Sequence, residues 1–145
     1  MSEFNANAPS ESVSTPRNVA VIGASGSIGT SALDVIAASG GRLRASVLSV
    51  NNDVVKLVEL AKKFRPDAVV VANPNADRAP LAELPSEIEI LWGPDALAEV
   101  VRRPEIDVVL LAIVGVAGLR VAWSALEAGQ TLALANKEAL VAGGS

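Results

Sequence analysis

The chain has 145 residues, of which 50% are hydrophobic, and a formal net charge of −4 at pH 7. That length supports one hydrophobic core rather than two, and an acidic balance without a basic cluster argues against a nucleic-acid or anionic-membrane partner. Cysteine, histidine and tyrosine are all absent, which excludes disulfides, thiolate or histidine metal sites, Ser-His catalysis and a tyrosine acid.

Residues 1–16 lack both the basic start and the apolar block of a secretory signal, and their polar composition predicts a disordered tail. The longest apolar run, residues 108–119, is much shorter than the stretch of about 20 residues that crosses a bilayer. We therefore expect a cytoplasmic protein without membrane contacts, whose single domain spans residues 17–145.

The central motif is a short apolar strand, residues 19–22, that leads into a turn with glycines at 23, 26 and 29 and then into a helix. The first N–H groups of a helix have no internal partners, and its dipole is positive at this end. The turn therefore favours a bound anion such as a phosphate. The spacing G-x-x-G-x-x-G differs from the dinucleotide fingerprint by one position of the middle glycine, so a purely structural turn stays open.

Ser25 and Ser27 flank the middle glycine and have two interpretations. Their hydroxyls can donate to the phosphate, or either side chain can cap the helix that follows.

Strands and helices alternate along the rest of the chain, which predicts an α/β fold: a Rossmann-like, doubly wound, mostly parallel sheet with right-handed crossovers. Residues 77–90 are poorly patterned and are expected to hold one short helix and an outer strand. The expected helices are 27–39, 54–64, 93–102 and 119–128, and the expected strands are 19–22, 43–50, 68–72, 88–91, 107–114 and 131–135.

Ligands of such sheets bind at the carboxyl ends of the strands. Asn51, Asn52 and Asp53 follow the second strand, where a dinucleotide fold meets the adenosine ribose. Asp53 would accept from a ribose 2′-hydroxyl and favour NAD, whereas Asn51 and Asn52 would donate to a 2′-phosphate and favour NADP. Asp53 can instead cap the helix 54–64.

Three further polar residues, Asn136, Lys137 and Glu138, follow the last expected strand between apolar neighbours. They belong either to the ligand-binding edge or to a capped helix start. A glycine-bearing turn is expected at Gly115 and Gly118. Trp92 and Trp123 are expected to be packing residues.

The motifs GASGSIGTSALDVI (23–36), FRP (64–66), IVGVAGL (113–119) and LALANKEALVAGG (132–144) together resemble the amino-terminal, NADPH-binding domain of the 1-deoxy-D-xylulose 5-phosphate reductoisomerases. This family rearranges deoxyxylulose phosphate and reduces the product with NADPH to methylerythritol phosphate, in the non-mevalonate route to isoprenoids. Its members are homodimers that need Mg, Mn or Co.

The resemblance implies a role for each matching residue. Cofactor pyrophosphate would bind at Ser25, Gly26, Ser27 and Ile28, the adenosine ribose at Asn51, Asn52 and Asp53, and the nicotinamide half near Asn136 and Glu138. Lys137 would face the phosphorylated substrate. The catalytic and metal-binding residues of the family would lie outside these 145 residues, so the chain alone is expected to bind cofactor without turnover.

The sequence leaves two alternatives open. One is another NADP reductase with a similar glycine turn, and the other is a stand-alone NAD(P)-sensing module.

Overall fold

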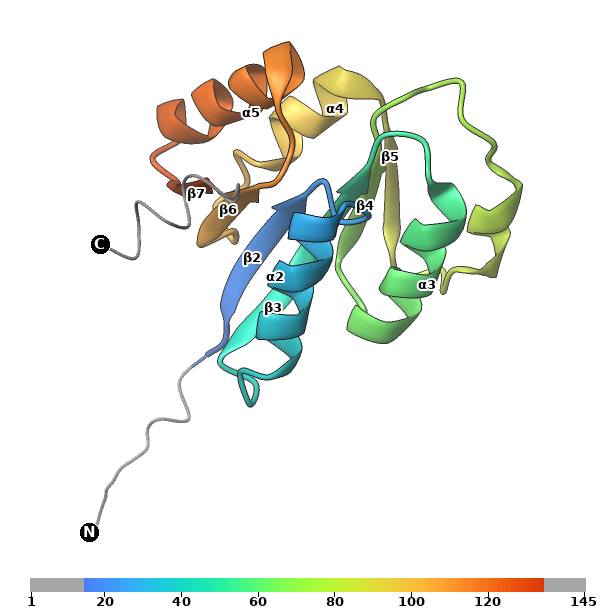
Figure 1. Ribbon diagram of the computed structural model, residues 1–145, viewed down its shortest axis with the longest axis horizontal. Coiled ribbons are helices and arrows are strands. Elements are labelled where there is room, and N and C mark those ends of the chain that lie inside the picture. Colours follow the sequence, from blue (N-terminus) through green and yellow to red (C-terminus); the bar gives the residue numbers. More distant parts are fainter. Residues whose placement is uncertain (1–14, 135–145) are drawn as a thin grey trace, which may run out of the picture.

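The computed structural model describes residues 15–134, which form a single sheet flanked by helices (Figure 1). The strands are β2 (Arg17–Ile22), β3 (Leu43–Val50), β4 (Ala68–Val71), β5 (Glu89–Trp92), β6 (Val108–Leu111) and β7 (Thr131–Leu134). The helices are α2 (Ser27–Ala37), α3 (Val54–Phe64), α4 (Gly93–Val100), α5 (Gly115–Glu127) and the short 3₁₀ helix η1 (Ala79–Glu83).

The sheet has six parallel strands in the order β5-β4-β3-β2-β6-β7. The chain first moves outward from β2 through β3, β4 and β5, and then returns to the other side of β2 to add β6 and β7. The strand order therefore reverses at β2, next to β6. This is the doubly wound arrangement that the sequence predicts, and its reversal point is where open α/β sheets bind ligands.

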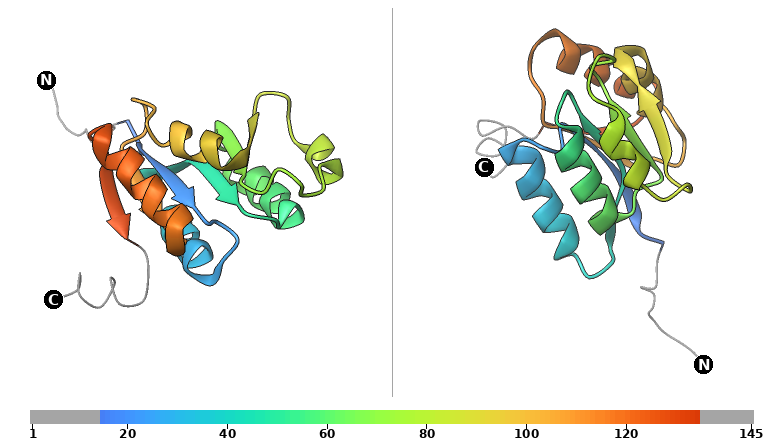
Figure 2. Two further views of the ribbon diagram at one scale, coloured as in Figure 1. Left: turned by 90° about the horizontal axis from the view of Figure 1, so that it is seen from above. Right: turned by 90° about the vertical axis from the view of Figure 1, so that its right-hand side faces the viewer.

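Helices cover both faces of the sheet, as Figure 2 shows. The strand pleat sends Val21 into the core under α2 and α3, and its neighbour Ile22 into the core under α4 and α5. Both faces of the central strands are therefore buried, which explains their continuous apolar runs. Leu57 of α3 is fully buried, and burying such a side chain is worth about 1.5–3 kcal/mol.

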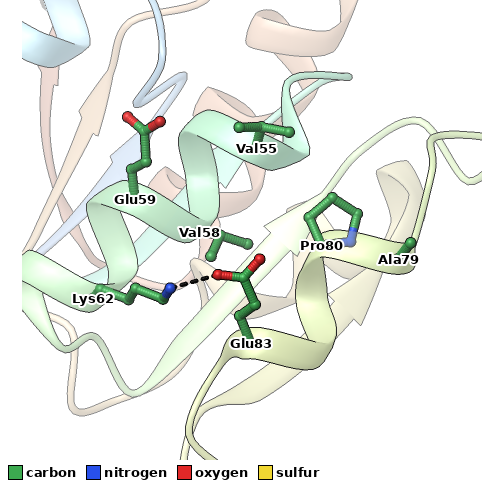
Figure 3. A pocket seen from close by; sticks show the side chains of 7 residues that line it. All are labelled: Val55, Val58, Glu59, Lys62, Ala79, Pro80 and Glu83. Carbon is green, nitrogen blue, oxygen red and sulfur yellow. Dashed lines mark hydrogen bonds and ion pairs between the residues drawn. The ribbon is translucent and has the colours of Figure 1, made fainter.

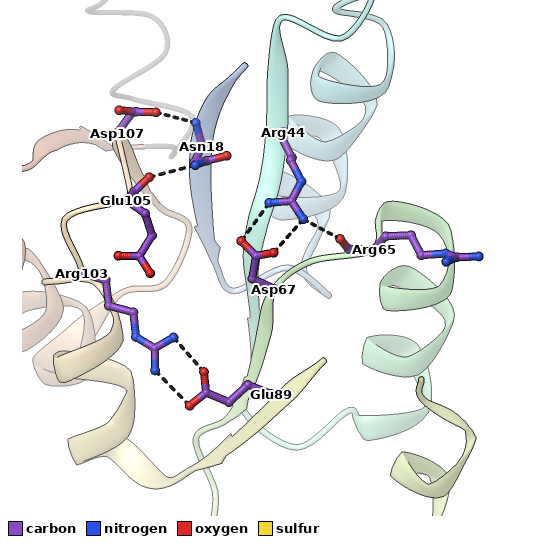
Figure 4. A network of polar contacts seen from close by, with 8 residues as sticks. All are labelled: Asn18, Arg44, Arg65, Asp67, Glu89, Arg103, Glu105 and Asp107. Carbon is purple, nitrogen blue, oxygen red and sulfur yellow. Dashed lines mark hydrogen bonds and ion pairs between the residues drawn. The ribbon is translucent and has the colours of Figure 1, made fainter. Parts of the chain in front are cut away.

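The amino-terminal edge of the sheet is held by polar contacts between neighbouring segments (Figure 4). Arg44 of β3 forms a bidentate ion pair with Asp67, with both N–O distances 2.9 Å, and Arg103 forms one with Glu89 of β5 at 2.8 and 3.1 Å. The hydrogen bond from Arg44 lowers the pKa of Asp67, and that from Arg103 lowers the pKa of Glu89. These contacts therefore join the amino-terminal ends of neighbouring strands and lie at the edge opposite the glycine turn.

Most expected elements occur where the sequence places them, and β3 and α3 have the expected bounds. Near the carboxyl terminus two bounds are wrong: β6 ends at Leu111 rather than at 114, and α5 begins at Gly115 rather than at 119. Gly115 has φ +81°, which turns the chain into the helix. Gly118 therefore lies inside α5, where a β-carbon would come within 2.8 Å of the Ile113 carbonyl oxygen.

The two tryptophans differ. Trp92 packs against the core under α3, and the Arg78 guanidinium lies 4.0 Å from its ring centroid. Trp123 is 67% exposed, so the packing expectation is wrong for it within residues 15–134. It belongs to a row of exposed apolar side chains on α5, whose buried face is made of smaller residues; the row comprises Val116, Leu119, Trp123 and Leu126.

Candidate functional site

A cavity of about 430 Å³ opens at the carboxyl ends of the central strands. It is lined from the ends of β2, β3, β4 and β6 and from α4 and α5, and none of its lining residues is charged. They are Gly23, Ser49, Val50, Asn51, Ala72, Leu97, Ala112, Ile113, Val114 and Ala117. The cavity thus lies at the point where the strand order reverses.

The turn between β2 and α2 presents free backbone donors beside this cavity. The N–H groups of Gly23 and Ala24 donate to Ser49 of β3, to its Oγ at 3.0 Å and its carbonyl oxygen at 2.7 Å. Within residues 15–134, the N–H groups of residues 25–28 have no hydrogen-bond acceptor. Four adjacent free donors at the positive end of a helix suit an anion with several oxygens, such as a diphosphate.

Neither serine caps the helix. The cap position of α2 is Gly26, without a side-chain hydrogen bond, so the capping alternative for Ser25 and Ser27 is wrong. Both hydroxyls stay available for a ligand. Ser25 is partly buried, whereas Ser27 is exposed at the start of the helix.

The three glycine positions of the turn differ in how much room they leave for a side chain. Gly23 has φ +93°, and a β-carbon there would lie 2.6 Å from the Ile113 Cγ2 atom. At Gly29 a β-carbon would strike the Gly23 carbonyl oxygen. Gly26 has an ordinary φ of −76° and nothing nearer to its β-carbon position than 3.9 Å. Packing within the described chain therefore does not require Gly26, which is the cap position of α2, where glycine is common, and leaves room for a ligand to approach the backbone closely.

A second helix begins at the same cavity. Val114, the cap position of α5, and Ala117 in its first turn are lining residues. Neither α2 nor α5 has an acidic residue in its first turn or a side-chain cap. Two uncapped positive helix ends therefore meet where β2 and β6 end, which favours a bound anion although no cationic side chain lines the cavity.

The Asn51–Asp53 segment follows β3 as expected, and its three residues take different positions. Asn51 lines the cavity. The Asn52 Oδ1 atom accepts a hydrogen bond from the Asn73 Nδ2 atom at 2.5 Å, which leaves the side-chain NH₂ group of Asn52 available as a donor. Asp53 caps α3 through a bond from the Lys56 N–H at 3.1 Å, so its capping role is confirmed.

Ser49 and Ile113 line the cavity but were missed as site residues from the sequence. A serine inside the apolar strand 43–50 is the signal that could have identified the first. Asn136, Lys137 and Glu138 lie outside the described residues, as does almost all of the expected tail 1–16.

Two other hollows in the described part of the chain differ from this cavity. One lies between α3 and η1, where Lys62 and Glu83 form an ion pair at 2.6 Å (Figure 3). Another, beside α2, is lined almost wholly by apolar side chains. The hollow beside α2 includes the Ile28 side chain, but neither hollow includes Gly23, Ser25, Gly26 or Ser27.

Within residues 15–134, no cluster of three or more histidine, cysteine, aspartate or glutamate side chains could hold a metal ion. None of the helices in that range combines the length and apolar character needed to traverse a lipid bilayer.

A family model described as 1-deoxy-D-xylulose 5-phosphate reductoisomerase matches residues 19–144. The chain belongs to this family. Family membership excludes the alternative that the chain belongs to another reductase class with a similar glycine turn. Among curated members of the reductoisomerase family, the chain is 44% identical to the protein of Phocaeicola vulgatus over 131 residues and 44% identical to that of Ralstonia nicotianae over 130 residues.

Solved reductoisomerase structures share the fold. The Zymomonas mobilis reductoisomerase in complex with NADPH has 39% sequence identity and a TM-score of 0.76, and the match covers 89% of this chain and 34% of that one. A DOX-P reductoisomerase in complex with NADPH, fosmidomycin and magnesium has 36% identity and a TM-score of 0.74, with coverage of 86% and 31%. The curated matches cover 88% of this chain, which spans about a third of the length of those relatives.

Proposed function

We propose that this chain is the cofactor domain of a 1-deoxy-D-xylulose 5-phosphate reductoisomerase and binds NADPH across the carboxyl edge of its sheet. The observation that carries the proposal is the set of four free N–H groups at residues 25–28 beside an open Gly26. Two relatives of the same fold are complexes with NADPH, which supports this choice of ligand.

In this proposal the backbone N–H groups of Ser25, Gly26, Ser27 and Ile28 hold the pyrophosphate, and the two serine hydroxyls add donors. The dinucleotide then extends to the adenosine ribose beside the Asn51–Asp53 segment. Asn51 and Asn52 donate to a 2′-phosphate there, whereas the Asp53 carboxylate already accepts a bond within α3. This donor set favours NADPH over NADH.

The other half of the dinucleotide extends towards the end of β6, where Ile113 and Val114 give the cavity an apolar wall that excludes water from the nicotinamide. When bound, NADPH supplies a hydride for reduction of an aldehyde. By resemblance, Asn136 and Glu138 contact the nicotinamide half, and Lys137 faces the phosphorylated substrate.

We further propose that residues 17–145 form one cofactor-binding domain and that the whole reductoisomerase converts deoxyxylulose phosphate to methylerythritol phosphate in isoprenoid biosynthesis. The family resemblance adds a divalent metal (Mg, Mn or Co) and a homodimer, and the absence of cysteine fits the proposed cytoplasmic location. The described residues do not provide a metal-binding cluster, so the proposal assigns the metal and the catalytic step to other parts of the enzyme. The 145-residue chain then binds cofactor but does not turn over substrate, because substrate, metal and cofactor are not held together.

Calorimetric titration of the 145-residue chain with NADPH and NADH tests cofactor binding. We expect saturable binding of NADPH and weaker binding of NADH. A folded sample that binds neither nucleotide contradicts the proposal. The expected lack of turnover is tested by incubating the chain with deoxyxylulose phosphate, NADPH and Mg²⁺. Measurable NADPH oxidation would contradict it.

A further inference from the structure

Ser49 connects β3 to the glycine turn through two bonds. It is the penultimate residue of β3 and is 2% exposed. Its Oγ atom accepts the Gly23 N–H at 3.0 Å, and its carbonyl oxygen accepts the Ala24 N–H at 2.7 Å. A single residue on the neighbouring strand therefore occupies the first two donors of the turn.

These two bonds decide which donors remain for a ligand. Because the N–H groups of Gly23 and Ala24 point to Ser49, the free donors begin at Ser25 and include those of residues 25–28. The carbonyl bond is available from any residue at position 49, but the bond to Gly23 needs a side-chain acceptor. A buried N–H group without an acceptor is costly, so the turn would shift to satisfy it if the hydroxyl were absent.

The residues packed around Gly23 determine what such a shift would change. Gly23 already has φ +93° and close neighbours in Ala112 and Ile113 at the end of β6, so it has little room on that side. Gly23 also lies directly beneath α2, where its carbonyl oxygen faces Gly29. A displaced Gly23 would therefore change the position of the helix end whose N–H groups form the anion site.

We propose that Ser49 is a positioning residue for the dinucleotide: its hydroxyl fixes Gly23 so that the N–H groups of residues 25–28 converge on the pyrophosphate. This inference rests on the proposed cofactor function. It adds a residue that does not belong to the glycine motif and acts through the turn.

The same strand offers a matched control. Ser46 is also in β3, is 1% exposed, and its Oγ atom is buried without a hydrogen-bond partner. It lies where the register between β2 and β3 shifts, towards the amino-terminal part of the strand. Ser46→Ala therefore removes a buried serine hydroxyl from β3 without affecting the turn.

The experiment compares Ser49→Ala, Ser49→Thr and Ser46→Ala with the unmodified chain by calorimetry, at a temperature where circular dichroism shows each one folded. We expect Ser49→Ala to bind NADPH about 2- to 12-fold more weakly, because the hydrogen bond that holds Gly23 in place is lost. Ser49→Thr retains the hydroxyl and should restore most of the affinity, and Ser46→Ala should bind like the unmodified chain.

A second ligand separates positioning of the turn from general damage. Adenosine 2′-monophosphate has the ribose phosphate but no pyrophosphate, and its weak binding can be followed by NMR. Its affinity should be the same in Ser49→Ala and in the unmodified chain. Equal losses for both ligands, or equal losses in Ser49→Ala and Ser46→Ala, would show a merely structural role and overturn the inference.

Amide hydrogen exchange on the unmodified chain gives a test that does not depend on the folding of a variant. The Gly23 N–H should be protected without nucleotide, while those of Ser25, Gly26 and Ser27 should exchange rapidly and become protected with NADPH. Rapid exchange at Gly23 would overturn the inference. If the unmodified chain binds no NADPH, the proposed function fails and this inference with it; if it binds and Ser49→Ala binds equally well, only the inference fails.

Discussion

Two glycines of the same turn should respond in opposite ways to a single added methyl group. At Gly29 the new β-carbon would strike the Gly23 carbonyl oxygen and lie 2.9 Å from the Ala24 Cα atom. At Gly26 the nearest such atom is 3.9 Å away. Gly29→Ala is therefore a packing change, whereas Gly26→Ala adds a methyl group only to the surface on which we place the pyrophosphate.

The magnitudes follow from these distances. Relief of the contact at Gly29 requires α2 to move away from the turn, and overpacking of this kind costs about 1–3 kcal/mol. For a domain of this size that lowers Tm by about 4–12 °C. Gly26→Ala should cost less than about 1 kcal/mol, the usual effect of changing a helix-cap residue, but should weaken NADPH binding at least about 10-fold because the methyl group occupies the ligand's approach.

Thermal unfolding followed by circular dichroism and calorimetric titration with NADPH measure the two effects separately. The distinguishing result is a stable but weakly binding Gly26→Ala and a clearly destabilised Gly29→Ala. NADPH affinity unchanged in Gly26→Ala would refute the proposed position of the pyrophosphate. An unchanged Tm in Gly29→Ala would refute the close contact between α2 and the turn.

Three further variants test the fold. Leu57→Ala empties a fully buried site in the core under α3 and should reduce the free energy of unfolding by about 2–5 kcal/mol in urea titrations; a loss below about 1 kcal/mol would contradict the packing described. Since the pKa of Glu89 is lowered by its hydrogen bonds from Arg103, the ion pair stabilises the fold above the unfolded-state pKa near 4 and loses that contribution as the pH falls through the lower folded-state pKa. Arg103→Gln should therefore reduce the difference in urea midpoint between pH 7 and pH 3, whereas the control Arg42→Gln should not; an equal difference in both would count against the pair. Trp123→Gln should change stability by less than about 0.5 kcal/mol, because the indole is 67% exposed, and a larger loss would show that something covers it.

The sequence was sufficient for most of the fold because the central strands are buried on both sides. Continuous apolar runs at 19–22 and 68–72 and the mostly apolar strand 43–50, separated by helical patterns, permit few arrangements other than a parallel sheet. The end of α3 was also predictable, since Pro66 closely follows its last turn. Local chemistry and tertiary packing agree in these segments.

Prediction was weaker where glycines have more than one use. Gly115 and Gly118 were expected in a turn, but the first starts α5 and the second lets that helix approach Ile113. Glycine's role at such a position depends on which backbone lies next to it, and that is set by tertiary contacts. The exposure of Trp123 was not predictable for the same reason. An aromatic residue in a helical pattern does not reveal whether its side of the helix packs against another element.

The site was predictable in outline. The turn and the position of Asn51 after β3 follow from motif and topology, and Asn51 does line the cavity. The competing capping roles could not be separated from sequence, because Asp53 caps its helix whereas Ser25 and Ser27 do not. Ser49 was missed because its contact with Gly23 joins residues 26 positions apart. The roles of Asn51, Asn52 and Asp53 at the ribose, and of residues 136–138, stay predictions.

The four N–H donors at residues 25–28 are peptide groups, and the hydroxyls of Ser25 and Ser27 beside them are also uncharged. Peptide N–H groups do not ionise between mildly acidic and mildly alkaline pH. A fall in the pH of the cell would therefore not change the charge of these donors or their ability to bind a phosphate. Replacing side chains at positions 25, 27 and 28 also leaves its main-chain donors in place. An inhibitor that gripped the turn through its backbone would therefore be difficult to escape by point substitution there.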